Sequence, residues 1–149
     1  MAAEPWTPQA VTEGEWAGWT LWSADPFELL AGPFYARQDE DGRRICAFRA
    51  ERKHMNSHGA MHGGCLMTFA DYAIFCLASE HLGPGSAVTA QMSCDFVGAA
   101  LEGEQIECTG EVVRAGGALI FLRGEIRAEG RIVFTYSAIL KKMRSAQRG

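Results

Sequence analysis

Asp71 is the residue whose type and surroundings point most clearly to chemistry. It is the only charged residue in the apolar stretch 65–78, and its helical neighbours at three and four positions are Thr68 and three apolar residues. Burying an unpartnered carboxylate costs several kcal/mol, and a desolvated carboxylate is a candidate general base. The alternative is a structural role, with a hydrogen bond from Thr68 or from a residue of a packed sheet.

Two glycines, Gly63 and Gly64, follow His62 directly before this stretch. Glycine lets a ligand or another chain approach the backbone closely, and the first N–H groups of a helix have no intrahelical acceptor. The positive end of the helix dipole strengthens their attraction for a negative oxygen. The pattern predicts an oxyanion-binding site; an ordinary junction between loop and helix is the alternative.

Two other sets of reactive side chains lie nearby. His54, His58 and His62 recur at every fourth position and would form a metal-binding face on a helix. The glycines and the asparagine among them disfavour a continuous helix, so we predict no metal site. Cys65 beside His62 could form a Cys–His nucleophile, but a cysteine that opens an apolar run is more typically an inert core residue.

The elements that must position these residues are one long helix and a series of strands. Residues 64–82 are apolar on nearly every face, which predicts a helix buried nearly all round. A short helix is expected to begin at Asp25 and to end at Gly32. Strands are predicted at residues 34–37, 43–52, 88–96, 106–112, 120–126 and 131–143. The predicted fold class is α+β, with one long buried helix wrapped by a curved antiparallel sheet.

Length and tryptophan distribution predict the domain organisation. A chain of 149 residues corresponds to one domain. Residues 1–24 contain all four tryptophans without a clear period. We therefore predict a Trp-rich N-terminal arm over residues 1–24, packed on the domain or on a partner, and a single domain over residues 25–149.

Charge and cysteine usage exclude several classes of protein. The 14 basic and 18 acidic residues give a net charge of −4, which argues against nucleic-acid binding through bulk charge. The stretch 65–78 is too short and too polar for a membrane span. The five cysteines form no close pair, and no secretory signal precedes them, so we expect a cytoplasmic location.

The sequence resembles a known family through residues 56–64, which read Asn-Ser-His-Gly-Ala-Met-His-Gly-Gly, and through Asp71 seven residues later. This pattern resembles that of the hotdog-fold acyl-CoA thioesterases, in the phenylacetate-degradation branch. The resemblance covers residues 34–143, including the strand order. It implies a hotdog fold that hydrolyses acyl-CoA to free acid and coenzyme A, a reaction that requires no cofactor.

The resemblance also implies residue roles. Asp71 would be the general base or the nucleophile, so that direct attack and activation of a water both remain open. The Gly63 N–H would polarise the thioester carbonyl, Asn56 would hold the water, and His62 would orient the loop or the thioester. Thr89 would donate a hydrogen bond near Asp71.

Substrate binding involves further candidates. Gly64 allows close approach of the substrate, and Arg114 is a candidate for the phosphates of coenzyme A. Residues 101–149 carry eight basic and six acidic groups, against six basic and twelve acidic groups in residues 1–100. The acyl group, aryl or medium-chain, stays open. A hotdog hydratase or dehydratase and a non-catalytic acyl-CoA-binding module are the alternative functions.

The spacing of Gly63 and Asp71 predicts a site built from two chains. Eight residues along one helix separate two positions by about 12 Å, whereas a base and an oxyanion donor must both lie within about 3 Å of groups around one carbonyl. Two antiparallel helices related by a two-fold axis satisfy this requirement. We therefore expect a homodimer, and the resemblance implies a further pairing into a dimer of dimers.

Overall fold

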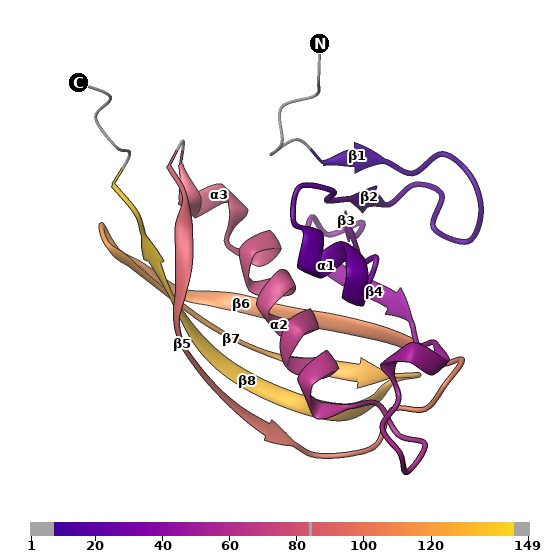
Figure 1. The fold of residues 1–149 in the computed structure, drawn as a ribbon. Helices are drawn as coiled ribbons and strands as arrows, with labels where there is room; N and C mark the ends of the chain where they lie inside the picture. Colours follow the sequence, from indigo (N-terminus) through magenta and orange to yellow (C-terminus); the bar gives the residue numbers. More distant parts are fainter. Residues whose placement is uncertain (1–7, 84, 145–149) are drawn as a thin grey trace.

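One long helix lies against a curved antiparallel sheet in the computed structural model, which describes residues 8–83 and 85–144 (Figure 1). The strand order is β1-β2-β3-β4-β6-β7-β8-β5. The helices are α1 (Pro26–Ala31), α2 (Gly63–Leu77) and α3 (Ser79–Leu82), with a 3-10 turn at Arg52–His54. The strands are β1 (Gln9–Ala10), β2 (Thr20–Leu21), β3 (Tyr35–Gln38), β4 (Arg44–Arg49), β5 (Ala87–Phe96), β6 (Gln105–Ala115), β7 (Leu119–Ala128) and β8 (Arg131–Lys142). The predicted α+β class is confirmed.

The long helix is shorter than the sequence predicts. It ends at Leu77, and α3 follows after Ala78, whose ψ of 2° is not helical. The single helix expected over residues 64–82 is therefore wrong. The amino-acid pattern gives no warning of this break, because the stretch around Ala78 contains neither glycine nor proline.

The composition of the helix predicted that it is buried nearly all round, and this prediction is wrong. The residues that face the sheet are buried, among them Phe69, Ala73 and Ile74. A stripe at helical spacing is exposed or half-buried, and Met67 within it is 40% exposed. We call this the uncovered stripe of α2; its members are Gly64, Met67, Thr68, Asp71 and Phe75.

Two glycines allow a tyrosine to lie inside the curve of the sheet. Gly110 on β6 pairs with Gly124 on β7, and Gly124 pairs in turn with Tyr136 on β8. A Cβ atom at Gly110 would lie only 2.6 Å from the Tyr136 hydroxyl oxygen. The absence of both side chains therefore makes room for the phenol ring under α2.

The described part of the Trp-rich arm adds two short strands to the sheet, since β2 pairs with β3 and β1 pairs with β2. The Trp16 and Tyr35 rings stack with centroids 4.6 Å apart. The Arg37 guanidinium lies 4.8 Å from the centroid of the Trp19 ring. Residues 8–24 thus pack on the sheet, while the division at residue 24 into arm and domain stays a prediction.

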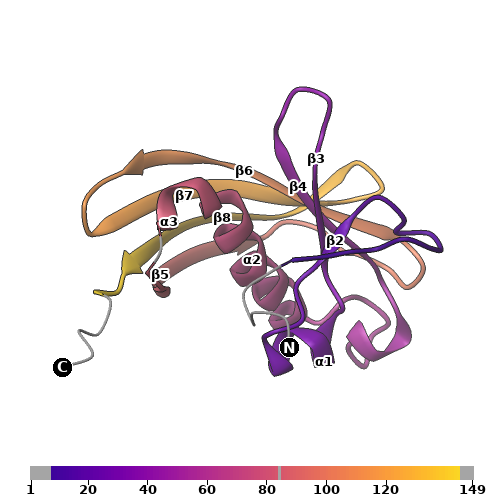
Figure 2. The same ribbon diagram turned by 90° about the horizontal axis from the view of Figure 1, so that it is seen from above.

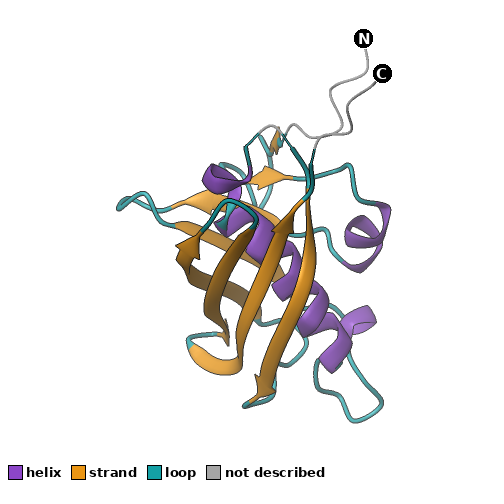
Figure 3. Ribbon diagram, turned by 90° about the vertical axis from the view of Figure 1, so that its left-hand side faces the viewer, coloured by secondary structure: helices purple, strands orange, loops and turns teal. Residues whose placement is uncertain are grey.

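Two further elements frame the helix. Seen from above, α1 lies beside α2 on the same side of the sheet (Figure 2). Asp25 caps α1 as predicted, because its Oδ1 accepts hydrogen bonds from the backbone N–H groups of Phe27 and Glu28. At the opposite end of the strand order, β5 forms the sheet edge next to β8. Figure 3 shows the strands of the sheet and the long helix from the side.

Candidate active site

Asp71 and Thr89 form a direct hydrogen bond between the middle of α2 and the edge strand β5. The Thr89 hydroxyl donates to Asp71 Oδ1 at 2.5 Å. A hydroxyl donor to a carboxylate is a charge-assisted bond, typically about 2.5–2.7 Å long. Asp71 is half-buried and makes no other side-chain hydrogen bond or ion pair within the described residues. Oδ2 therefore stays available to a ligand.

A β-bulge explains how Thr89 reaches this position. Thr89 pairs with Leu140 and Gln91 pairs with Ile139, so Ala90 is the additional residue on β5. Strict alternation would put Thr89 and Met92 on opposite faces of the strand. The bulge shifts the alternation by one residue, and both side chains line the same cavity beside α2.

The start of α2 leaves one backbone donor free. The ring Nδ1 of His62 accepts a hydrogen bond from the Gly64 N–H at 2.9 Å. The His62 carbonyl oxygen accepts from the N–H groups of Cys65 and Leu66. Among the described residues, the Gly63 N–H makes no hydrogen bond. The Gly63 N–H is therefore available to donate to a ligand.

Gly63 is also tightly packed against a ring. A Cβ atom there would lie 2.9 Å from Cε1 of Phe96. Gly64 is exposed, and its N–H is occupied by His62. The two predicted glycines therefore differ: one presents a free donor, and the other completes the helix cap.

Asn56 holds the loop that precedes α2. Its Oδ1 accepts hydrogen bonds from the backbone N–H groups of His58 at 2.9 Å and Ala60 at 3.2 Å. The carboxamide NH₂ makes no hydrogen bond within the described part of the chain. Since an amide nitrogen only donates, Asn56 has two donors available for a water or a carbonyl oxygen.

The predicted site residues thus fall into two groups in one chain. Asp71 and Thr89 form the first, and Asn56, His62 and Gly63 form the second at the start of α2. Because Gly63 and Asp71 are eight residues apart on an uninterrupted helix, about 12 Å separates the two groups. One chain does not bring them together.

Arg114 lies apart from both groups. Arg114 belongs to a row of paired residues that crosses the sheet from β6 to β5 and continues through Phe121, Ile139 and Gln91. The neighbouring row, which includes Ile120, Leu140 and Thr89, faces the helix. Side chains alternate between the faces, so Arg114 lies on the outer face of the sheet and is not brought to Asp71 within this chain.

A cavity of about 400 Å³ opens beside Asp71. It is lined by residues of α1, α2 and β5: Asp25, Phe27, Glu28, Met67, Thr68, Asp71, Thr89 and Met92. Sequence reasoning missed the contribution of α1. The sequence did predict the start of α1 at Asp25, but no local pattern indicates that this helix packs next to Asp71.

Glu28 is one of three carboxyl groups that line this cavity, together with Asp25 and Asp71. It is half-buried. Burial raises the pKa of the Glu28 carboxyl from 4.5 to about 7, with further contributions from the negative charges of Asp25 and Asp71. Near neutral pH, the protonated and ionised forms of Glu28 are therefore both present, whereas an ordinary glutamate is fully ionised.

The other reactive side chains have structural roles. His54 Nδ1 accepts from the Glu51 N–H, and Nε2 donates to the Ala31 carbonyl at 2.6 Å, so both ring nitrogens are occupied. Burial raises the pKa of the Cys65 thiol to about 11, which opposes a thiolate nucleophile. The described residues contain no group of three His, Cys, Asp or Glu that could hold a metal ion.

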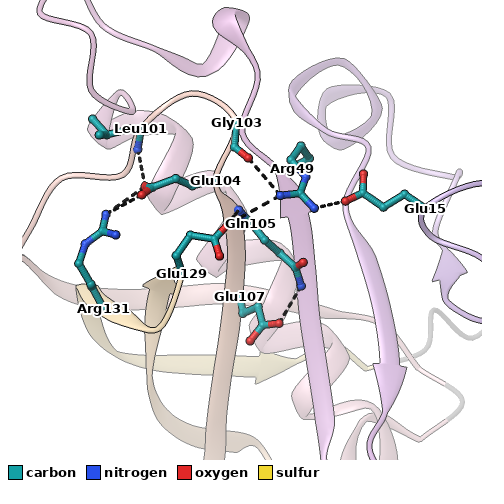
Figure 4. Close-up of polar contacts among 9 residues, drawn as sticks. All are labelled: Glu15, Arg49, Leu101, Gly103, Glu104, Gln105, Glu107, Glu129 and Arg131. Carbon is teal, nitrogen blue, oxygen red and sulfur yellow. Dashed lines mark hydrogen bonds and ion pairs between the residues drawn. The ribbon is translucent and has the colours of Figure 1, made fainter.

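A second polar cluster lies at the far end of β4, β6 and β7 (Figure 4). Its arginines have acidic partners: Arg49 contacts Glu15, and Arg131 contacts Glu104 at 2.9 Å. A hollow of about 180 Å³ beside it is lined by Gln105, Glu107, Arg127, Glu129 and Gly130. Arg127 is also paired, with Glu125 at 2.7 Å. Because each of these arginines has an acidic partner, we interpret the cluster as a solvated ion-pair network rather than a reactive site.

Comparison with known proteins decides the family. The sequence profile of the thioesterase superfamily matches residues 58–135. This chain belongs to the thioesterase superfamily. A Pseudomonas aeruginosa protein, provisionally named an esterase, is 32% identical over 120 residues, which cover 80% of this chain and 90% of that protein.

Two further matches refine the placement of this thioesterase. Human acyl-coenzyme A thioesterase 13 is 29% identical over 72% of this chain and 78% of its own length. A mutant form of the phenylacetic acid degradation protein PaaI of Thermus thermophilus has a TM-score of 0.68 and 28% identity, and the match covers 80% of this chain and all of that one (100%). The predicted hotdog fold, the phenylacetate-degradation resemblance and the enzyme class are confirmed.

No helix within residues 8–83 and 85–144 is long and apolar enough to cross a bilayer.

Proposed function

We propose that this thioesterase hydrolyses acyl-CoA thioesters to a free acid and coenzyme A. The observation that carries the proposal is the Thr89–Asp71 hydrogen bond inside an open cavity. The free Gly63 N–H supports it, as does the relative that is named for this activity. The aryl or medium-chain character of the acyl group stays open, since Phe27, Met67 and Met92 offer apolar walls for either.

The chemistry assigns one task to each group. Thr89 fixes Oδ1 of Asp71, and Oδ2 removes a proton from water or attacks the thioester carbon itself. In the first route the water oxygen bonds to the carbonyl carbon, the C–S bond breaks, and the coenzyme A thiolate takes up the proton that Asp71 removed. In the second route the carboxylate oxygen displaces the thiolate and forms an anhydride between Asp71 and the acyl group. Water then hydrolyses the anhydride to the free acid and the Asp71 carboxylate, and the proton released goes to the thiolate. The Gly63 N–H stabilises the developing oxyanion, Asn56 positions the water through its NH₂ group, and His62 orients the loop as the cap of α2.

We further propose that each site combines two chains in a homodimer. Gly63 of one chain would meet Asp71 of the other, since a single helix holds them about 12 Å apart. The exposed members of the uncovered stripe of α2 and the open cavity beside it support this proposal, because both are accessible to a second copy. A dimer of dimers would bring in further surfaces, and binding of coenzyme A phosphates by Arg114 depends on such an assembly because Arg114 lies on the outer face.

Gly64 is proposed to border the substrate at the exposed start of α2. A cytoplasmic location also belongs to the proposal: all five cysteines are free thiols, which suits a reducing compartment. The reaction as proposed uses protein groups and water alone.

A panel of acyl-CoA thioesters with free-thiol detection tests the activity. We expect thiol release from at least one substrate by the wild-type protein. Asp71→Asn should fold normally, with unchanged or slightly higher thermal stability, and should lose about 10²–10⁴-fold in rate because the swap removes the base. Wild-type turnover by a folded Asp71→Asn protein would refute the assignment.

The same panel separates the alternatives. A hotdog hydratase or dehydratase would change the absorbance of an unsaturated acyl-CoA without releasing thiol. A binding module would bind acyl-CoA in calorimetry without converting it. Either result would replace the proposed hydrolysis.

Subunit mixing tests the shared site. Asp71→Ala and Asn56→Ala are each expected to be inactive, and exchange of their subunits should restore activity. Under random pairing half of the dimers are mixed, and each mixed dimer has one intact and one doubly damaged site, so about a quarter of all sites recover. No recovery, despite exchange demonstrated by mass spectrometry, would place both residues in one chain's site.

A further inference from the structure

We propose that Glu28 controls the charge of the Asp71 site: its protonated form supports turnover, and its ionised form suppresses it. This inference rests on the proposed thioester hydrolysis. It assigns a function to α1, which none of the roles above includes. Glu28 is a positioning residue in this proposal, because it acts through the charge that surrounds the reacting groups.

The geometry places Glu28 and Asp71 on one cavity. Glu28 comes from α1 and Asp71 from α2, and both line the same space of about 400 Å³. Phe27, Met67 and Met92 also line this cavity and make part of its wall apolar. An acyl chain bound against these walls would exclude water and strengthen every interaction between charges in the cavity.

Within one chain, the charged groups around Glu28 are negative or already engaged. Asp25 precedes it on α1, and Asp71 faces it from α2. The Glu28 carboxyl makes no hydrogen bond or ion pair within residues 8–83 and 85–144. Lys53, the cation near the end of α1, donates to the carbonyl oxygens of Leu30 and Gly32.

The remaining titratable groups near Glu28 lie on α2, and neither of them can carry a positive charge. They are Tyr72 and Cys76, both of which sense the charge of Glu28. Burial raises the pKa of the Tyr72 hydroxyl far above neutrality. From β5 the cavity receives only Thr89 and Met92, which carry no charge. No group that the structure describes there would neutralise an ionised Glu28.

The reaction is sensitive to such a charge. Attack on the thioester puts a negative charge on the carbonyl oxygen, and the product is itself a carboxylate. Asp71 must be ionised to act as base. An ionised Glu28 would add a second negative charge next to both, and like charges in a shared site disfavour one another. A protonated Glu28 leaves Asp71 as the single charge of the pair.

The test is the dependence of kcat/KM on pH, which reports groups of the free enzyme. With the protonated form active and a pKa of about 7, wild-type kcat/KM should fall about fivefold between pH 7 and pH 8 and about tenfold per pH unit above that. Glu28→Gln, which is always neutral, should retain the activity seen at pH 6.5 and lose this decline.

Two further variants sharpen the assignment. Asp25→Asn removes a like charge, so the Glu28 pKa should fall and the decline should begin at lower pH; asparagine still caps α1. Glu80→Gln, an exposed residue on α3, is the matched control and should reproduce the wild-type profile. A decline that persists unchanged in folded Glu28→Gln protein overturns the proposal.

A readout without substrate separates the two levels of inference. In protein labelled with ¹³C at the glutamate side-chain carboxyl, one NMR resonance should titrate near pH 7, vanish in Glu28→Gln and titrate at lower pH in Asp71→Asn. If no glutamate titrates near pH 7, the Glu28 proposal fails while hydrolysis stands. If the resonance titrates as expected but no acyl-CoA is converted, the proposed function fails. The role of Glu28 in turnover then fails as well, although its titration near pH 7 stands.

Discussion

The two faces of α2, one toward the sheet and one formed by the uncovered stripe, differ in how deeply their side chains are buried. The face toward the sheet carries fully buried side chains, with Phe69 and Ile74 at 0% exposure. The uncovered stripe carries Asp71 and the 40% exposed Met67. Both faces are mostly apolar in sequence, so composition alone does not distinguish them. The difference is that one face packs and the other remains open to a ligand or a second chain.

This contrast explains where a carboxylate can be tolerated. On the sheet face, an ion would lose its water without a compensating partner, at a cost of several kcal/mol. On the stripe, Asp71 is only half-buried and accepts a hydrogen bond from Thr89. The helix therefore has the packed core on one side and the proposed catalytic carboxylate on the other.

The largest effect on stability should come from the sheet face. The Phe69 ring lies 4.7 Å from that of Phe48 and 5.1 Å from that of Phe34, centroid to centroid. Phe69→Ala is expected to lower the free energy of unfolding by about 3–5 kcal/mol, because it leaves a cavity in a packed aromatic cluster. Urea denaturation followed by circular dichroism measures the change.

Met67→Ala is the matched control on the other face. We expect a loss of about 0.5 kcal/mol or less, since partly exposed positions contribute little to stability. Similar losses for Phe69→Ala and Met67→Ala would show that the stripe is buried as well, for example inside a tight dimer, and would remove the contrast for the assembled protein.

A smaller effect is expected at the contact between stripe and sheet edge. Thr89→Ala removes one hydrogen bond to Asp71, worth about 0.5–1.5 kcal/mol, or roughly 2–13-fold in kcat/KM. Thr89→Ser keeps the hydroxyl and should stay close to wild type. A loss as large as that of Asp71→Asn would mean that the Thr89 hydroxyl takes part in the chemical step.

The smallest effect concerns metal removal. Chelators should leave activity unchanged, because His54 uses both ring nitrogens in hydrogen bonds and so cannot join His58 and His62 as a ligand. Activity assayed after dialysis against EDTA tests this. Reversible inactivation that zinc restores would revive the three-histidine metal site.

Several features of this protein followed from sequence alone. The apolar run that predicted a helix over residues 64–82, the capping residue Asp25 and the alternation along residues 106–112 and 120–126 are local signals, and each describes its own segment, although the helix ends at Leu77. The run of residues 56–64 with Asp71 carried the resemblance, and the helical spacing of Gly63 and Asp71 gave their separation. Local patterns succeed here because backbone hydrogen bonding and side-chain periodicity depend on near neighbours.

Tertiary structure alone decided the surroundings of Asp71. The bulge at Ala90 reverses the side of β5 on which Thr89 lies, although the alternating sequence of that strand gives no sign of it. The uncovered stripe of α2 exists because the sheet curves around only part of the helix. The packing of α1 next to Asp71 places Glu28 in the same cavity and raises its pKa through burial. These are contacts between segments distant in sequence, and a residue's own neighbours along the chain do not encode which distant element will cover it.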